Sequence, residues 1–75
     1  MHVICKQDAA RSWLNYEGQW TDNLFQAAKF HDSNEAVQIV HKLNEGKEKT
    51  VAATEHVTMA AIRYNGFNKV GEDYP

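Results

Sequence analysis

The chain has 75 residues, a formal net charge of −2 and a single cysteine. This length allows one small domain, residues 1–75, and leaves little room for a deep catalytic pocket. One cysteine excludes an intramolecular disulfide, and the low acidic charge excludes a general attraction to nucleic acid or anionic lipid.

The apolar segments predict the compartment. The N-terminal apolar stretch is too short for a signal peptide, and no apolar run is long enough to cross a bilayer. A small secreted domain would also need several disulfides. We therefore expect a cytoplasmic protein with no membrane contact.

Two strands are expected at the N-terminus. Residues 1–6 are apolar and β-branched, and residues 11–16 form a second extended segment that resumes after a turn at Gly18. Trp13 and Leu14 are adjacent, so an extended chain points them to opposite faces. One of the two would then be exposed, or another element would cover it.

Helical signals fill the middle of the chain. A cluster of cap- and turn-forming residues at 21–23 precedes a single helical turn. The main helix is expected from about Ser33 to Asn44, because its apolar residues recur with a period of 3.6. Asp32 or Ser33 can cap its start, and Gly46 can take the left-handed conformation that ends it.

Residues 50–70 fit two structures. Val and Thr are frequent there, which favours a strand, but the same stretch can be drawn as an alanine-rich helix that ends at Asn65 and Gly66. Asn65-Gly66 is also a hairpin signal, which would pair Tyr64 with Phe67 across a tight turn.

Together these elements predict an α+β fold. A small antiparallel sheet carries one amphipathic helix, in the order β-β-α-β, with the C-terminal third ambiguous between strand and helix and with residues 71–75 frayed. The core is expected to contain six large apolar side chains, namely Ile4, Phe25, Phe30, Val37, Val40 and Leu43.

The residues that could carry chemistry do not form a recognisable motif. His2, His31, His41 and His56 lie too far apart in the sequence for the close ligand pairs of a structural zinc site. Cys5 could meet His56 across a sheet, but no signature of an activated thiolate, an orienting group or an oxyanion site accompanies them. We therefore expect no catalytic residues, no metal and no cofactor, and hence not an enzyme.

Basic and aromatic residues alternate in the N-terminal third. The candidate binding residues are Arg11, Trp13, Tyr16 and Trp20. On an exposed sheet face they would stack unpaired bases, whereas a chain with few other large apolar residues would use the same aromatics as its core. The net acidity disfavours phosphate binding. An exposed Tyr16 or Trp20 would serve equally well as an anchor for a protein partner.

A pattern extends from the N-terminal turn to the main helix. The sequence EGQWTDNL at residues 17–24 is followed by AAKF at 27–30 and by a capped segment at 32–36. This arrangement, which reaches to about Glu45, resembles short uncharacterised proteins of phages and prophages. In those proteins a β-hairpin ends in a Trp-Thr step, and an Ala-x-x-Phe segment and a capped helix follow. The resemblance implies a phage accessory protein that binds and modulates a host protein, and it assigns no catalytic or ligand-binding residue.

The leading hypothesis is a small non-catalytic protein-binding or regulatory protein whose partner is another protein. Two alternatives stay open. One is a single-stranded nucleic-acid-binding module that uses Trp13, Tyr16 and Trp20, and the other is a self-associating structural protein that forms a homodimer.

Overall fold

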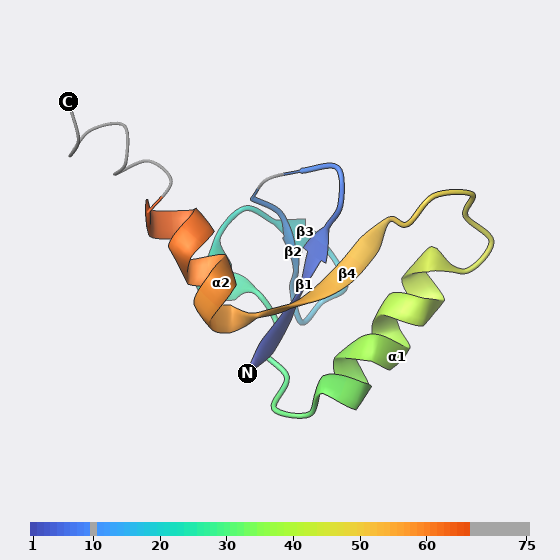
Figure 1. The fold of residues 1–75 in the computed structure, drawn as a ribbon, viewed down its shortest axis with the longest axis horizontal. Coiled ribbons are helices and arrows are strands. Elements are labelled where there is room, and N and C mark those ends of the chain that lie inside the picture. Colours follow the sequence, from blue (N-terminus) through green and yellow to red (C-terminus); the bar gives the residue numbers. More distant parts are fainter. Residues whose placement is uncertain (10, 67–75) are drawn as a thin grey trace.

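A computed structural model describes residues 1–9 and 11–66 and shows a four-stranded antiparallel sheet in the order β3-β2-β1-β4 (Figure 1). The α+β class expected from the sequence is confirmed. The strands are β1 (His2–Lys6), β2 (Trp13–Leu14), β3 (Trp20–Thr21) and β4 (Ala52–His56).

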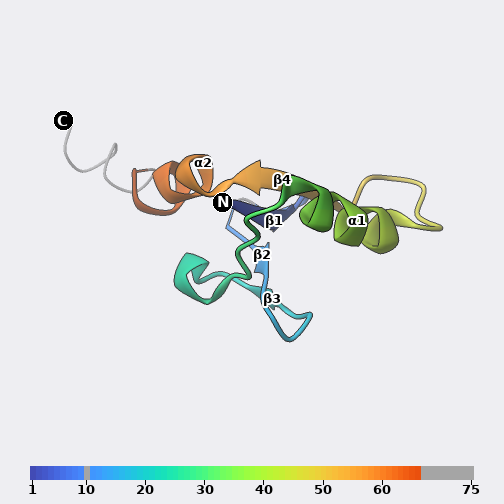
Figure 2. The ribbon, with the colours of Figure 1, turned by 90° about the horizontal axis from the view of Figure 1, so that it is seen from below.

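Four helical segments accompany the sheet. They are the 3-10 turn η1 (Leu24–Gln26), the helix α1 (Ser33–Asn44), the short helix α2 (Val57–Ala61) and the π-helical turn η2 (Ile62–Gly66). In Figure 1, α1 and α2 lie on opposite sides of the ribbon formed by β1 and β4, and Figure 2 shows η1 beside the β2–β3 hairpin. None of the helices in the described part of the chain has the length and apolar character needed to span a bilayer.

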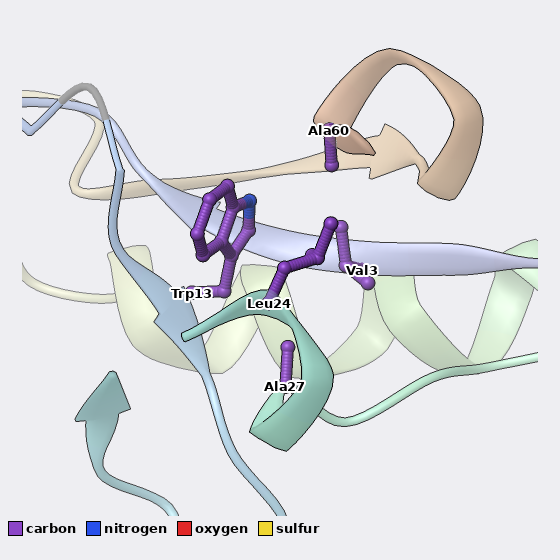
Figure 3. Packing of buried hydrophobic residues seen from close by; sticks show 5 residues of the cluster. All are labelled: Val3, Trp13, Leu24, Ala27 and Ala60. Carbon is purple, nitrogen blue, oxygen red and sulfur yellow. The ribbon is translucent and has the colours of Figure 1, made fainter. Parts of the chain in front are cut away.

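Both faces of the sheet are covered, which explains why Trp13 and Leu14 can be adjacent. Trp13 is 0% exposed and Leu14 is 7% exposed. The first core cluster consists of Val3, Trp13, Leu24, Ala27 and Ala60 (Figure 3), and the second consists of Ile4, Leu14, Ala36 and Ala52. Neighbouring residues of β1 and β2 therefore enter different clusters, as the alternation of side chains along a strand requires.

The strand β1 is the centre of the sheet. It pairs with β4 along its whole length, from His2 opposite His56 to Lys6 opposite Ala52. On its other side it pairs with β2 only near Cys5, and the backbone of Phe30 occupies the end beside His2 through two hydrogen bonds of 2.8 and 2.9 Å. The segment after η1 thus completes the sheet where β2 is too short.

The main helix begins and ends where the sequence predicts. Asp32 caps it, because its carboxylate accepts a hydrogen bond of 2.9 Å from the Asn34 amide. Gly46 follows the last turn with a φ of +75°, a conformation that favours glycine. Gly18 also has a positive φ, +81°, in the expected turn between β2 and β3.

The C-terminal third contains a strand and then a helix. The strand preference is confirmed for Ala52–His56 but is wrong beyond it, since α2 begins at Val57. The side chain of His56 caps the new helix, because its Nδ1 accepts a hydrogen bond of 3.1 Å from the Thr58 amide. The predicted hairpin turn at Asn65-Gly66 is wrong, because these two residues belong to η2, which continues the helical path. Its partner Phe67 and the fraying predicted for 71–75 lie outside the described residues.

Two of the expected core residues are at the surface. Phe25 is 81% exposed and Val37 is 37% exposed, whereas Ile4 is 0% exposed as expected. The expected residues Phe30, Val40 and Leu43 are half-buried around the second core cluster. Alanines were missed because each buries little area, yet five are buried in the clusters or beside them, namely Ala27, Ala28, Ala36, Ala52 and Ala60. Their small side chains let turns and helices approach the sheet closely.

Candidate functional site

The structure distributes the four predicted binding residues over different surroundings. Trp13 is fully buried in the first core cluster, and Trp20 is half-buried against the second, on the other face of the sheet. Tyr16 is 73% exposed in the turn between β2 and β3. Arg11 lies over the ring of Tyr64, 5.4 Å from its centroid. The two tryptophans therefore do not share a face, and Tyr16 and Arg11 have other neighbours.

Three aromatic rings form a row that runs from the core to the surface. The rings of Trp13 and Tyr64 meet edge to face with centroids 5.7 Å apart, and those of Tyr64 and Phe25 meet in the same way at 5.9 Å. Arg11 supports the row from the side, since its guanidinium also donates a hydrogen bond to the carbonyl of Tyr64. Phe25, at the outer end, is the most exposed large apolar side chain in the described part of the molecule.

The turn that carries Phe25 is fixed by its own polar side chains. The Asn23 side chain caps η1 by accepting a hydrogen bond of 3.0 Å from the Phe25 amide, and the Thr21 hydroxyl accepts one of 3.1 Å from the Asn23 amide. The ammonium of Lys29 closes the other end by donating to the carbonyls of Leu24 and Ala27, at 2.6 and 3.0 Å, and to that of Phe25 at 3.3 Å. The backbone that carries the exposed Phe25 ring is therefore fixed by hydrogen bonds at both ends of the turn.

Lys29 also connects this turn to Tyr16. Its backbone amide donates a hydrogen bond of 3.0 Å to the Tyr16 hydroxyl. Lys29 therefore donates to residues that carry the two most exposed large apolar side chains of the described part, to the backbone carbonyl of Phe25 and to the hydroxyl of Tyr16. Sequence reasoning named Tyr16 as a candidate binding residue, counted Lys29 among the basic residues that alternate with aromatics, and placed Phe25 in the core. The cap-forming Asn23 was a usable signal, because a capped single turn gives its middle residue a defined direction without requiring burial.

A pocket of about 410 Å³ lies at the end of β1, lined by Cys5, Lys6, Gln7, Asp8, Ala9 and Arg63. The guanidinium of Arg63 forms an ion pair with Glu55, donating to both carboxylate oxygens at 2.5 and 2.7 Å. Burial, and secondarily the Glu55 carboxylate, raise the pKa of the Cys5 thiol, while Arg63 acts in the opposite direction. The thiol therefore stays protonated at neutral pH and is a weak nucleophile.

The pairing of Cys5 with His56 that the sequence left open is wrong. The register places His56 opposite His2 and Cys5 opposite Ala53, so the thiol and the imidazole lie on different faces of the sheet. The rings of His2 and His56 meet edge to face at 5.5 Å. Because Nδ1 of His56 accepts the Thr58 hydrogen bond, that nitrogen does not serve as a metal ligand here. Among the described residues, no three His, Cys, Asp or Glu side chains gather as a metal site would need.

Comparison of the chain with protein-family models, curated proteins and solved structures gives no match.

Proposed function

We propose that this protein is a non-catalytic protein-binding or regulatory protein of the cytoplasm, and that the turn carrying Phe25 contacts its partner. One observation carries the proposal. Phe25 leaves 81% of its surface exposed although it stands on a turn that Asn23 and Lys29 hold at both ends.

The Phe25 side chain is restricted before any partner binds. Binding usually costs the freedom of the side chains and loops that become ordered at the interface. The capped turn and the edge contact with Tyr64 already restrict Phe25, so little further ordering is required. A rigid aromatic ring that fills a pocket of a partner is a common source of binding energy at protein interfaces. The weakly nucleophilic Cys5 thiol is consistent with a non-catalytic role.

The cations near Phe25 favour a protein over a nucleic acid. The Lys29 ammonium has three hydrogens and three backbone carbonyl acceptors within hydrogen-bond distance, so a phosphate would have to compete with the turn itself. The net charge of −2 opposes phosphate binding as well. A single-stranded nucleic acid is the second candidate ligand, and the observation in its favour is the exposed pair of rings, Tyr16 and Phe25, beside a lysine.

The experiment is affinity capture with tagged wild-type protein and two variants from lysate of the source cell, each with and without nuclease treatment, with quantitative mass spectrometry. Phe25→Ala is expected to reduce recovery of the partner by tenfold or more, on the order expected for loss of an interface anchor. The matched control is Met59→Ala, which shortens another exposed side chain on α2 and should leave recovery unchanged.

The outcomes discriminate among the candidate functions. Equal recovery by wild type and Phe25→Ala contradicts a role for this turn. Material that disappears on nuclease treatment moves the assignment to nucleic acid. Recovery of only the protein's own sequence, with a dimer in sedimentation velocity that Phe25→Ala dissociates, identifies self-association. Capture of a host protein would support the role as a modulator of a host protein that the resemblance to phage and prophage proteins implies.

A further inference from the structure

The outer edge of β4 is closed at one end by a side chain. In Figure 2, β4 lies at the end of the sheet, between α1 and α2. The carboxamide of Asn44, the last residue of α1, accepts hydrogen bonds of 2.7 and 2.9 Å from the amides of Val51 and Ala52, and it donates one of 3.0 Å to the Ala52 carbonyl. It therefore bonds to both backbone groups of Ala52, as a residue of a neighbouring strand would.

The register shows which other groups of β4 point outward. At the two ends of β4, the Val51 carbonyl and the Val57 amide bond to the chain on either side of β1. Bonding directions alternate along an antiparallel strand, so the amides and carbonyls of Ala52, Thr54 and His56 point away from β1. The carbonyl of His56 is used by α2, because His56 is the N-cap of that helix. The amide and carbonyl of Thr54 and the amide of His56 are thus offered to a further strand.

A second copy of β4 matches this arrangement. When two β4 strands lie antiparallel with Thr54 opposite Thr54 of the second copy, the two threonines exchange both of their backbone hydrogen bonds. Ala52 of one chain then lies opposite His56 of the other, and the His56 amide points at the Ala52 carbonyl. Asn44 donates to that same carbonyl, so this pairing requires the Asn44 donor to withdraw.

The side chains of β4 do not oppose such pairing. Edge strands are commonly protected by lysine or proline, and the sequence of β4, AATEH, contains neither. Its one carboxylate, that of Glu55, is largely buried and is held by Arg63 through two hydrogen bonds. It therefore presents no unpaired charge to a second copy. The Asn44 carboxamide protects this edge instead.

We infer that the outer edge of β4 is a strand-pairing surface for a second copy of this chain, and that the Asn44 carboxamide keeps it closed. Release requires the end of α1 to move, which the connection between α1 and β4 permits because it is exposed over residues 45–50. The surface does not include the turn around Phe25, so the inference is independent of the proposed function.

Sedimentation velocity over a concentration series tests the inference, with urea titration of the same samples to show that each variant is folded. Asn44→Ala removes the carboxamide and is expected to form a dimer whose dissociation constant is about tenfold or more below that of wild type. Asp32→Ala is the control, because it weakens α1 at its other end and leaves Asn44 in place. It is expected to sediment as wild type does.

Two double variants test where the copies meet. Thr54→Pro removes an amide that points away from β1, so β4 keeps its bonds to β1 while the centre of the pairing loses its donors. Asn44→Ala with Thr54→Pro is therefore expected to be a monomer. Asn44→Ala with Phe25→Ala is expected to remain a dimer, which separates this edge from self-association through the turn around Phe25.

A folded Asn44→Ala protein that stays monomeric throughout the series overturns the inference, as does a dimer that persists when Thr54→Pro is added. An equal dimer of Asp32→Ala also overturns it, because a weakened α1 would then be the cause. If Asn44→Ala does not fold, Asn44→Asp decides, since it keeps both acceptor bonds and loses the donor to the Ala52 carbonyl. It is expected to dimerise, and a monomer overturns the inference. Failed capture by Phe25→Ala bears on the proposed function alone.

Discussion

The two faces of the sheet are covered in different ways. One face carries α1, a helix of 12 residues with its own cap and apolar stripe. The other is covered by η1, α2 and η2, segments of three to five residues that are too short to be stable alone. These short segments enclose Trp13 and are held by it. Local sequence is enough to form α1 on one face, whereas the short segments on the other face depend on the buried indole of Trp13.

The largest expected effect is therefore on Trp13. Trp13→Ala removes the ring around which the first core cluster is built and is expected to lower the free energy of unfolding by about 3–5 kcal/mol, enough to unfold a domain of this size. Trp13→Phe should retain a cooperative transition, because it keeps an aromatic ring and removes an indole N–H that has no acceptor among the described residues. Urea denaturation followed by circular dichroism measures both.

The half-buried Trp20 is the control on the α1 face. Trp20→Ala is expected to cost clearly less than Trp13→Ala, because its ring is not enclosed. An equal loss for the two alanine variants would contradict the contrast between the faces.

Asn44 tests how α1 is attached to the sheet. Its amide oxygen accepts hydrogen bonds from the backbones of Val51 and Ala52 at 2.7 and 2.9 Å, and its amide nitrogen donates to the Ala52 carbonyl at 3.0 Å. This side chain takes the place of a neighbouring strand at the outer edge of β4. Asn44→Ala leaves these part-buried groups without their partners and is expected to cost about 1–3 kcal/mol in a urea titration.

Asn44→Asp is the matched variant, because it retains the two acceptor bonds and loses the single donor. Its cost should lie between those of wild type and Asn44→Ala. If Asn44→Ala is as stable as wild type, the edge of β4 does not depend on this side chain.

Substitution of the two helix caps, Asp32 of α1 and His56 of α2, compares the helices on the two faces directly. Asp32→Ala removes the cap of α1 and is expected to lower stability by about 1 kcal/mol, with loss of helical circular dichroism. His56→Ala removes the cap of α2 and should change the helical signal less, since only five residues are involved. A larger far-ultraviolet change in His56→Ala than in Asp32→Ala would contradict this order.

The smallest effect concerns the Cys5 thiol. Burial, and then Glu55, raise its pKa from an ordinary value of 9.0, so the folded state favours the protonated form. The stabilisation this gives is present below pH 9.0, where the thiol is protonated in the unfolded chain too, and is lost as the pH rises above that value. Reaction with a thiol reagent at pH 8 should be slower in the folded protein than in urea.

Glu55→Gln removes the carboxylate that raises this pKa and leaves Arg63, whose charge lowers it. We expect the thiol to react faster than in wild type, because its pKa falls when the Glu55 charge is removed. Asp8→Asn, a charge change at an exposed carboxylate on the same pocket, is the control and should leave the rate near that of wild type. A slower reaction in Glu55→Gln would contradict the sign of the effect.

The candidate site shows where sequence reasoning reached its limit. Asn23 indicated a capped turn, and that turn is present. Its hydrophobicity predicted Phe25 in the core. Instead, Leu24 in the turn and Ala27 just after it occupy the first core cluster, and Phe25 is exposed to solvent. Tyr64, in a segment whose sequence fits a strand, a helix or a hairpin, lies beside Phe25 because α2 folds over Trp13. Contacts between residues some 40 positions apart leave no local pattern.

The sequence alone determined the local elements: the first strand, the turn at Gly18, the capped turn after Asn23 and the helix from Ser33 to Asn44. The two turns and the helix depend on hydrogen bonds within a few residues, and the first strand shows as a short apolar, β-branched run, so a local pattern records each of them. Only the tertiary structure decided that both faces of the sheet are covered, that the chain changes from strand to helix at His56, and that Phe25 is exposed. These features follow from the need to enclose Trp13, and that requirement is met by segments distant in the sequence.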